Sequence, residues 1–302
     1  LVTGAVAIAF APVFVRWSEV GPTATAFFRL ALAVPILVLL ARRGPRPAPP
    51  PTAKGPGWLL LLPGLCFALD LGFWHFSILY TTVANSTLLA NLAPVFVTLG
   101  GWLLWRRRVR RLFLTGMALA IVGAALLVGA SLELSGRRAL GDGLGVLTAV
   151  FYGSYILSVG HLRSRVGAAR IVAWAAGVAA LLLLPVALGR GEVFWPVTLR
   201  GWSVVVGLAL VTQVLGQGLI AWSLAHLPAS FSSVALLVQP ACVVLFGWIW
   251  FDETLGPIDA IGAVVMLAGI LIARRGSDYS SGGGGRRNSS SSAASGVPGS
   301  AS

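Results

Sequence analysis

Three ionisable side chains lie inside long apolar stretches of this sequence, where a charged group is energetically unfavourable and therefore often functional. They are Arg29, Asp70 and His75. A helix beginning near residue 58 would place Asp70 about 18 Å from that end, and Arg29 would lie about 10 Å inside the preceding span, at about 1.5 Å per residue. Asp70 could therefore pair with Arg29. His75 could relay a proton, because imidazole titrates near neutral pH.

Two interpretations of these residues are open. In the first, Asp70 and Arg29 neutralise each other and fix helix packing, while His75 forms a hydrogen bond near the membrane interface. In the second, Asp70 binds and releases a proton during a transport cycle, according to its solvation and its distance from Arg29. The second interpretation assigns all three residues to substrate binding or coupling.

Uncharged polar side chains at helical spacing could line the same site. Trp74 follows Asp70 by four residues, and Gln217 follows Gln213 in the same way, so each pair shares one helix face. Aromatic rings would contact the apolar part of a small amphipathic solute, and amides would contact its polar part. The alternative is that these side chains hold helices together or anchor the membrane interface.

Two prolines, Pro94 and Pro240, fall near the middle of apolar spans, beside Asn91 and Gln239. A proline inside a helix frees a backbone carbonyl and bends the helix, which is tolerated where neighbouring groups or cavity water satisfy that carbonyl. We therefore expect hinges at both prolines and substrate contacts from Asn91 and Gln239. A purely structural kink is the alternative.

The composition indicates that these residues are positioned by membrane helices. Hydrophobic residues make up 57% of the chain and charged residues 10%, and the mean hydropathy is +0.88. A soluble protein of this size would need more polar surface. Since about 20 apolar residues span a bilayer as a helix, the sequence predicts an all-α integral membrane protein with ten transmembrane helices. They lie near 1–16, 22–41, 58–80, 83–105, 112–130, 142–161, 168–189, 201–224, 230–251 and 257–273.

A repeat with a constant offset of 146 residues relates the two halves of the chain. Five helices per half would invert the second half relative to the first, as in many secondary transporters. The connection after the first repeated Trp is basic (106–111), whereas the matching connection after the second begins Asp252-Glu253. The repeated residues are Gly72, Ser77, Ser86, Pro94, Gly101, Trp102, Gly116 and Gly123, matched by Gly218, Ser223, Ser232, Pro240, Gly247, Trp248, Gly262 and Gly269.

Basic residues predict the orientation, because positively charged loops stay in the cytoplasm. With the N-terminus inside, cytoplasmic segments hold 16 of the 22 basic residues. The prediction is a multi-pass protein of the plasma (inner) membrane with both termini cytoplasmic. Residues 1–130 would form the first five-helix repeat, 131–275 the second, and 276–302 a disordered Gly/Ser-rich tail. The Pro-rich residues 44–57 would form an extended connection.

Two segments resemble the EamA domains of the drug/metabolite transporter superfamily. They are Tyr80–Trp105 (YTTVANSTLLANLAPVFVTLGGWLLW) and Leu224–Arg275, which ends in IDAIGAVVMLAGILIARR. The resemblance implies ten helices in two inverted halves around a central cavity, and export of small metabolites or drugs or uptake of related solutes. One departure is that Arg106-Arg107 stands where such proteins often carry Glu-Arg.

Other functions have little support in the sequence. There is no HExxH motif and no P-loop, and Cys66 and Cys242 give no metal-ligand spacing. We therefore expect neither an enzyme nor a cofactor. The net charge of +13 fits basic loops beside anionic lipid rather than nucleic acid. The predicted function is secondary export of small organic metabolites or drugs, coupled to protons. The alternatives are a lipid or nucleotide-sugar translocator and a non-transporting membrane sensor.

Overall fold

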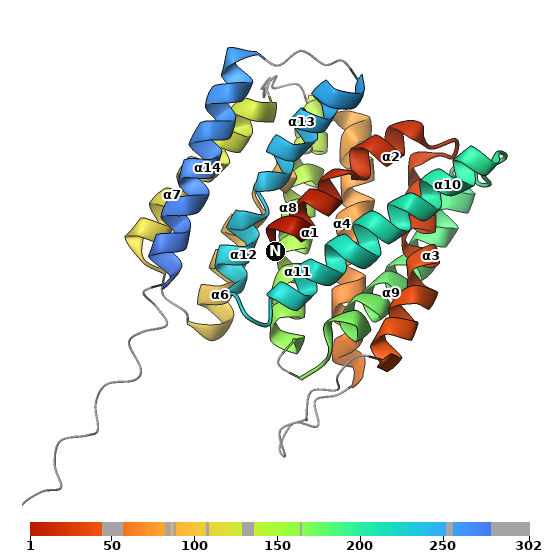
Figure 1. The fold of residues 1–302 in the computed structure, drawn as a ribbon, viewed down its shortest axis with the longest axis horizontal. Helices are drawn as coiled ribbons and strands as arrows, with labels where there is room; N and C mark the ends of the chain where they lie inside the picture. The colour runs from red at the N-terminus through yellow and green to blue at the C-terminus, as the bar shows by residue number, and fades with distance from the viewer. Residues whose placement is uncertain are drawn as a thin grey trace, which may run out of the picture.

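The computed structural model is a bundle of helices (Figure 1). It describes residues 1–43, 57–81, 86, 89–106, 109–128, 136–163, 165–251 and 256–278. Every regular element within these residues is a helix. Six of the described helices are long and apolar enough to cross a membrane, and four shorter apolar helices account for the other predicted spans. The predicted all-α fold with ten membrane helices is confirmed.

The first half of the chain begins with a broken span. α1 and α2 meet at Phe10, and Pro12 lies in the first turn of α2. Proline is tolerated there, because the backbone N–H groups of the first helical turn make no hydrogen bond within the helix. The elements of this half are α1 (Val2–Ala9), α2 (Ala11–Trp17), α3 (Pro22–Arg43), η1 (Gly57–Leu60), α4 (Leu61–Tyr80), α6 (Ala93–Trp105) and α7 (Arg111–Val128).

The second half contains a π-helix, η2, in the middle of its third span. A π-helix has wider turns than an α-helix, because each N–H bonds to a carbonyl five residues back. The elements of this half are α8 (Gly136–Leu162), α9 (Ala168–Gly189), α10 (Leu199–Leu208), η2 (Ala209–Gln217), α11 (Gly218–Ser223), α12 (Ala229–Ala235), α13 (Val238–Phe251) and α14 (Pro257–Asp278).

The helix bounds follow the sequence repeat. α9 begins and ends 146 residues after α3, and α14 begins 146 residues after α7. The repeated side chains also take equivalent environments. Trp102 and Trp248 are 54% and 52% exposed, so both point out of the bundle, and the repeated serines are all buried: Ser77, Ser86, Ser223 and Ser232.

α7 and α14 form the most extensive helix contact in the described structure and lie side by side in Figure 1. Glycines allow this close approach. A Cβ on Gly116 would overlap the backbone nitrogen of Ala273, and a Cβ on Gly269 would overlap that of Ala120. Two of the repeated glycines therefore serve close helix packing. α4 packs on α8, and α3 packs on α9, so the two halves interlock along their length.

Pro94 and Pro240 lie at the starts of helices rather than within continuous ones. α6 begins at Ala93, after a turn at Asn91 and Leu92. α13 begins two residues before Pro240, after a break that separates it from α12. The expectation of mid-helix prolines is therefore wrong. Each span is interrupted just before its proline, where the missing N–H removes no helical hydrogen bond.

Two other boundaries differ from the prediction. α8 begins at Gly136, before the expected start at residue 142. α14 continues to Asp278, so the first three residues of the predicted disordered tail are helical. The rest of that tail, residues 44–56 of the Pro-rich connection and Asp252-Glu253 lie outside the described residues.

Candidate substrate site

Charged residues from α3 and α4 lie close together inside the bundle. Asp70 is 8% exposed and is within electrostatic range of Arg29. Arg29 donates a hydrogen bond from Nε to Oε1 of Gln213 on η2, at 3.2 Å. The direct ion pair that Arg29 and Asp70 could form is not present in the described structure. The two charges are near enough to interact and still able to bind other groups.

Two tyrosines of α8 connect this charged pair to the amides of the second half. The Tyr155 hydroxyl donates to Oε1 of Gln217 at 3.3 Å, and Tyr152 shares a hydrogen bond with Gln239 on α13. The Tyr152 and Tyr155 rings stack at 6.2 Å, and Tyr155 also stacks on Phe67 of α4 at 5.0 Å. Both hydroxyls are within electrostatic range of Arg29 and Asp70.

The sequence prediction did not assign the tyrosines to the site, because an aromatic residue in an apolar span is as often a packing residue. The only local signal was two phenolic hydroxyls three residues apart, on one face of a helix. We call the group formed by Arg29, Asp70, Tyr152, Tyr155, Gln213, Gln217 and Gln239 the polar cluster.

The Gln213 amide has an unused donor within the polar cluster. Its side chain is fully buried, and its Oε1 accepts from Arg29, which fixes the orientation of the amide. Nε2 then has no hydrogen-bond partner among the described residues. A buried amide N–H without a partner is unfavourable by about 1–3 kcal/mol, so this position favours an acceptor such as a carboxylate oxygen.

The other predicted site residues are placed less centrally. Trp74 lies on α4, one turn after Asp70, and is half-buried. Asn91 lies in the turn before α6, and its Nδ2 is buried with no partner among the described residues. The side chain of His75 lies outside the described structure. Within the described residues, no three His, Cys, Asp or Glu side chains gather as a metal site.

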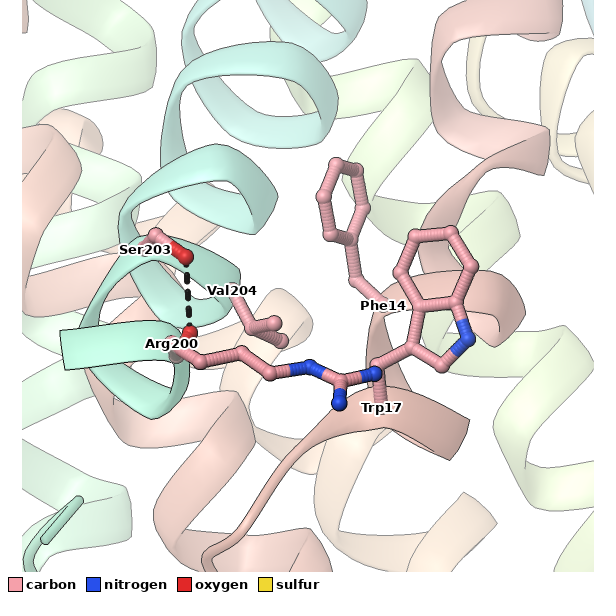
Figure 2. A pocket seen from close by; sticks show the side chains of 5 residues that line it. All are labelled: Phe14, Trp17, Arg200, Ser203 and Val204. Carbon is pink, nitrogen blue, oxygen red and sulfur yellow. Dashed lines mark hydrogen bonds between the residues drawn. The ribbon is translucent and has the colours of Figure 1, made fainter. Parts of the chain in front are cut away.

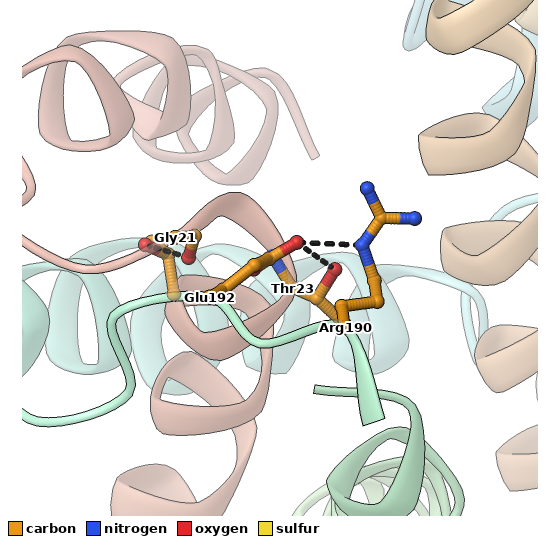
Figure 3. Close-up of polar contacts among 5 residues, drawn as sticks. Gly21, Thr23, Arg190 and Glu192 are labelled. Atoms are coloured by element: carbon orange, nitrogen blue, oxygen red, sulfur yellow. Dashed lines mark hydrogen bonds and ion pairs between the residues drawn. The ribbon is translucent and has the colours of Figure 1, made fainter. Parts of the chain in front are cut away.

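The loops at the arginine-poor end of the bundle cap each other's helices. Glu192 accepts hydrogen bonds from the backbone N–H of Thr23 at 2.9 Å, from its hydroxyl at 3.0 Å and from Nε of Arg190 at 2.7 Å (Figure 3). Burial alone would raise the pKa of Glu192, but these hydrogen bonds outweigh it, so the pKa lies below its ordinary value. Glu192 therefore caps α3 as a carboxylate.

Glu19, just before α3, makes the reciprocal contact. It accepts hydrogen bonds from the N–H groups of Val197 and Thr198, both at 3.1 Å, and from the Thr198 hydroxyl at the start of α10. The Thr198 hydroxyl and these backbone groups lower the pKa of Glu19. The ring of Phe28, next to Arg29, packs on Phe194 at 5.3 Å. Loop contacts and aromatic packing thus close this end of the bundle.

Two hollows lie outside the polar cluster. A small pocket of about 270 Å³ lies between α2 and α10, where the Arg200 side chain extends towards Phe14 and Trp17 (Figure 2). A larger groove of about 1250 Å³ lies at the opposite end, among α3, α9 and α11. Val214 and Leu215 of η2 line this groove, so η2 separates it from Gln213 and Gln217 of the polar cluster.

Comparison with protein families identifies the chain. The EamA-like transporter family matches residues 1–129 and again residues 139–275. The chain belongs to this family. This EamA-like protein is therefore a multi-pass membrane transporter, in a family of transporters rather than enzymes, and the resemblance seen in its sequence is confirmed.

Several curated relatives of this EamA-like transporter are exporters. The pseudopaline exporter CntI of Pseudomonas aeruginosa is 24% identical over 82% of this chain and 84% of its own. A probable terminal-alkyne amino-acid exporter of Streptantibioticus cattleyicolor is 24% identical over 89% of both chains. The threonine/homoserine exporter RhtA of Escherichia coli is 29% identical over 49% of this chain and 50% of its own.

A solved crystal structure has the same fold. Its TM-score is 0.75, at 18% sequence identity, and the match covers 92% of this chain and 96% of that chain. The agreement extends over both halves of the bundle, so the fold of this EamA-like transporter is shared with a protein of very different sequence.

Proposed function

We propose that this protein is a secondary transporter that exports a small amphipathic metabolite across the plasma membrane by alternating access, with protons as the coupling ion. The observation that carries the proposal is the polar cluster. It holds one cation and one carboxylate that interact without a direct ion pair. Opposite charges held apart inside a membrane bundle fit a solute that itself carries both charges.

An amino-acid-like solute matches the groups of the cluster. Its carboxylate would bind the free N–H groups of Arg29 and Nε2 of Gln213, because both are donors and the Gln213 donor has no partner among the described residues. Its ammonium group would bind Asp70, and its side chain would contact the stacked rings of Tyr152 and Tyr155. Two relatives, a threonine/homoserine exporter and a probable terminal-alkyne amino-acid exporter, support this solute class.

Coupling would follow from competition at Asp70. A protonated Asp70 no longer attracts an ammonium group, so proton entry from one side would release the solute on that side. A gradient drives such a cycle only if the solute binds the inward and outward states differently. The breaks before Pro94 and Pro240 are the proposed hinges, because each divides a span beside Asn91 or Gln239.

The orientation remains part of the proposal. The described arginine-bearing ends of α3, α6, α9 and α14 lie at the lower end of the bundle in Figure 1, and we assign this end to the cytoplasm by the positive-inside rule. Residues 1–130 and 131–275 are the two proposed repeat units. If this assignment holds, a reporter that is active only in the cytoplasm should be active when it is fused to either terminus. A reporter that is active only outside the cytoplasm should be inactive in the same fusions.

The test of transport uses everted membrane vesicles with an imposed proton gradient and a panel of radiolabelled amino acids, amino-acid analogues and cationic drugs. Wild-type protein should accumulate at least one solute, and a protonophore should abolish this accumulation. Asp70→Asn should lose it at matched protein level. Asp142→Asn is the control, since Asp142 lies on α8 outside the polar cluster. Equal, gradient-dependent transport by wild type and Asp70→Asn would refute the coupling role.

A lipid translocator is the second candidate, and the arginine-lined groove on the flank of the bundle favours it. A translocator would move fluorescent phospholipid between leaflets of proteoliposomes, with transport of amino acids absent. Wild-type proteoliposomes that scramble lipid no faster than protein-free vesicles would exclude this candidate.

A further inference from the structure

The groove among α3, α9 and α11 is the largest hollow described above, and it lies at the arginine-bearing end of the bundle. Its volume is about 1250 Å³. The C-terminal part of α3 forms one wall, the start of α9 a second, and the outer face of η2 and α11 a third. The groove is separate from the polar cluster, because η2 lies between them.

Four arginines line this groove, and no acidic residue is among its described lining residues. Arg163 is fixed to the protein, because its Nε donates to the carbonyl of Ala221 at 2.8 Å and its Nη1 to that of Val166 at 2.6 Å. The side chains of Arg42, Arg165 and Arg170 are exposed and make no hydrogen bond or ion pair with the described residues. The groove therefore presents several unneutralised cations at one end.

The remainder of the groove is apolar. Val38, Leu215 and Leu219 form its wall, and Trp174 and Trp222 are 46% and 55% exposed beside it. Tryptophan is enriched at the level of lipid headgroups, where its ring contacts acyl chains and its N–H contacts water. The combination of cations at the helix ends and an apolar surface along the helices matches the two parts of a phospholipid.

We propose that this groove binds an anionic phospholipid, with the phosphate against Arg42, Arg165 and Arg170 and an acyl chain along η2 and α11. Basic pockets between membrane helices commonly bind anionic lipid headgroups. A soluble anion would use the arginines but would leave the apolar wall uncovered. A zwitterionic lipid would cover the wall but would not neutralise the arginines.

The experiment measures the thermal unfolding of the full chain, purified in neutral detergent, with added phosphatidylglycerol or phosphatidylcholine. Phosphatidylglycerol should raise the Tm by about 3 °C more than phosphatidylcholine, because a ligand that binds only the folded state stabilises it. The triple variant R42Q/R165Q/R170Q should keep its Tm in phosphatidylcholine and lose the additional shift. Added salt should weaken the shift in wild type.

Two further variants distinguish binding in the groove from a general effect of positive charge on the Tm shift. R274Q/R275Q removes two arginines from the same end of the bundle, on α14 away from the groove, and should keep the full shift. Gly218→Leu should reduce the shift without removing any charge, because a Cβ at Gly218 meets only open space within 4 Å and a longer side chain would occupy the groove.

Three outcomes would overturn the proposal. Equal shifts with the two lipids would show that the headgroup charge is not recognised. An unchanged shift in the triple variant, confirmed as folded by its Tm in phosphatidylcholine, would place the lipid elsewhere. An equal shift with glycerol phosphate alone would identify a soluble anion as the ligand.

Discussion

The two halves of this transporter share a scaffold but not a site. The repeated serines and tryptophans occupy equivalent environments in both halves, and α3 and α9 have matching bounds. In contrast, every member of the polar cluster has an apolar residue or glycine at the equivalent position of the other half. Positions equivalent to Arg29, Asp70, Tyr152, Tyr155, Gln213, Gln217 and Gln239 hold Ala175, Gly216, Val6, Ala9, Phe67, Leu71 and Ala93.

This difference separates what the fold needs from what the solute needs. The scaffold requires small or buried residues wherever helices approach closely, and inversion repeats that requirement in each half. The site has to bind an asymmetric molecule. The first half supplies the charges, Arg29 and Asp70, and the second half supplies neutral donors and acceptors, such as Gln213 and Tyr155. Changes to the site should therefore affect transport, while changes to the scaffold should affect stability in both halves alike.

The largest expected effect is on transport in Arg29→Gln. The substitution removes a cation and the donor to Gln213, and charge-assisted hydrogen bonds contribute about 1.5–3 kcal/mol each, which corresponds to a fall of roughly tenfold to a hundredfold or more in transport rate. Vesicle uptake measures this fall. Arg200→Gln, in the pocket of Figure 2, is the control and should transport normally. Similar losses in both variants would contradict a special role for Arg29.

Gly116→Ala and Gly269→Ala should destabilise the protein by similar amounts, because each new Cβ would overlap backbone of the partner helix. Overpacking of this kind is unfavourable by about 1–3 kcal/mol. Thermal unfolding followed by tryptophan fluorescence measures the effect. Gly72→Ala and Gly218→Ala are matched controls, since their Cβ positions are open. Very different losses at Gly116 and Gly269 would show that the two sides of the contact between α7 and α14 are not equally tight.

Tyr155→Phe should weaken transport by less than Arg29→Gln. It removes one hydrogen bond to Gln217 while the ring can still stack on Phe67. The loss should be about 1 kcal/mol, or roughly fivefold in the KM for the solute. Ser154→Ala removes a hydroxyl on the same helix that donates to the carbonyl of Val150, and it should leave KM unchanged. An equal change in KM for both variants would assign the effect to α8 as a whole.

Glu192→Gln should change the pH dependence of stability slightly. Because the pKa of Glu192 is lowered in the folded state, its contribution is present above the unfolded pKa of about 4.3 and is lost as the pH falls further through the folded value. The effect should be below about 1 kcal/mol, as for other surface ion pairs. Unfolding midpoints from pH 7 to pH 3 test this. Wild type and variant should converge at the acidic end, and a constant difference would contradict the charge-based cap.

The sequence predicted the scaffold better than the site. Apolar length and the 146-residue repeat indicated ten helices in two similar halves, because these features follow from hydrophobicity and from residues that recur at a fixed spacing. The breaks before Pro94 and Pro240 were missed, since a proline in an apolar run can either bend a helix or begin one. Tyr155 and Gln217 are in contact although they are 62 positions apart in the sequence, and no local sequence pattern predicts a contact between residues so far apart.

The π-helix η2 marks the point in this span beyond which equivalent residues of the two copies face in the same direction. The first repeated residue of the second half, Gly218, directly follows η2. Downstream of it the copies match: Ser77 and Ser223 are buried, while Phe76 and Trp222 face outward. Upstream they do not, since Leu62 is 39% exposed whereas its counterpart Leu208 is 1% exposed. A chimera that exchanges segments between the copies from residue 72 onward would keep apolar side chains facing lipid, whereas one that starts at residue 62 would turn the wrong face towards the bundle.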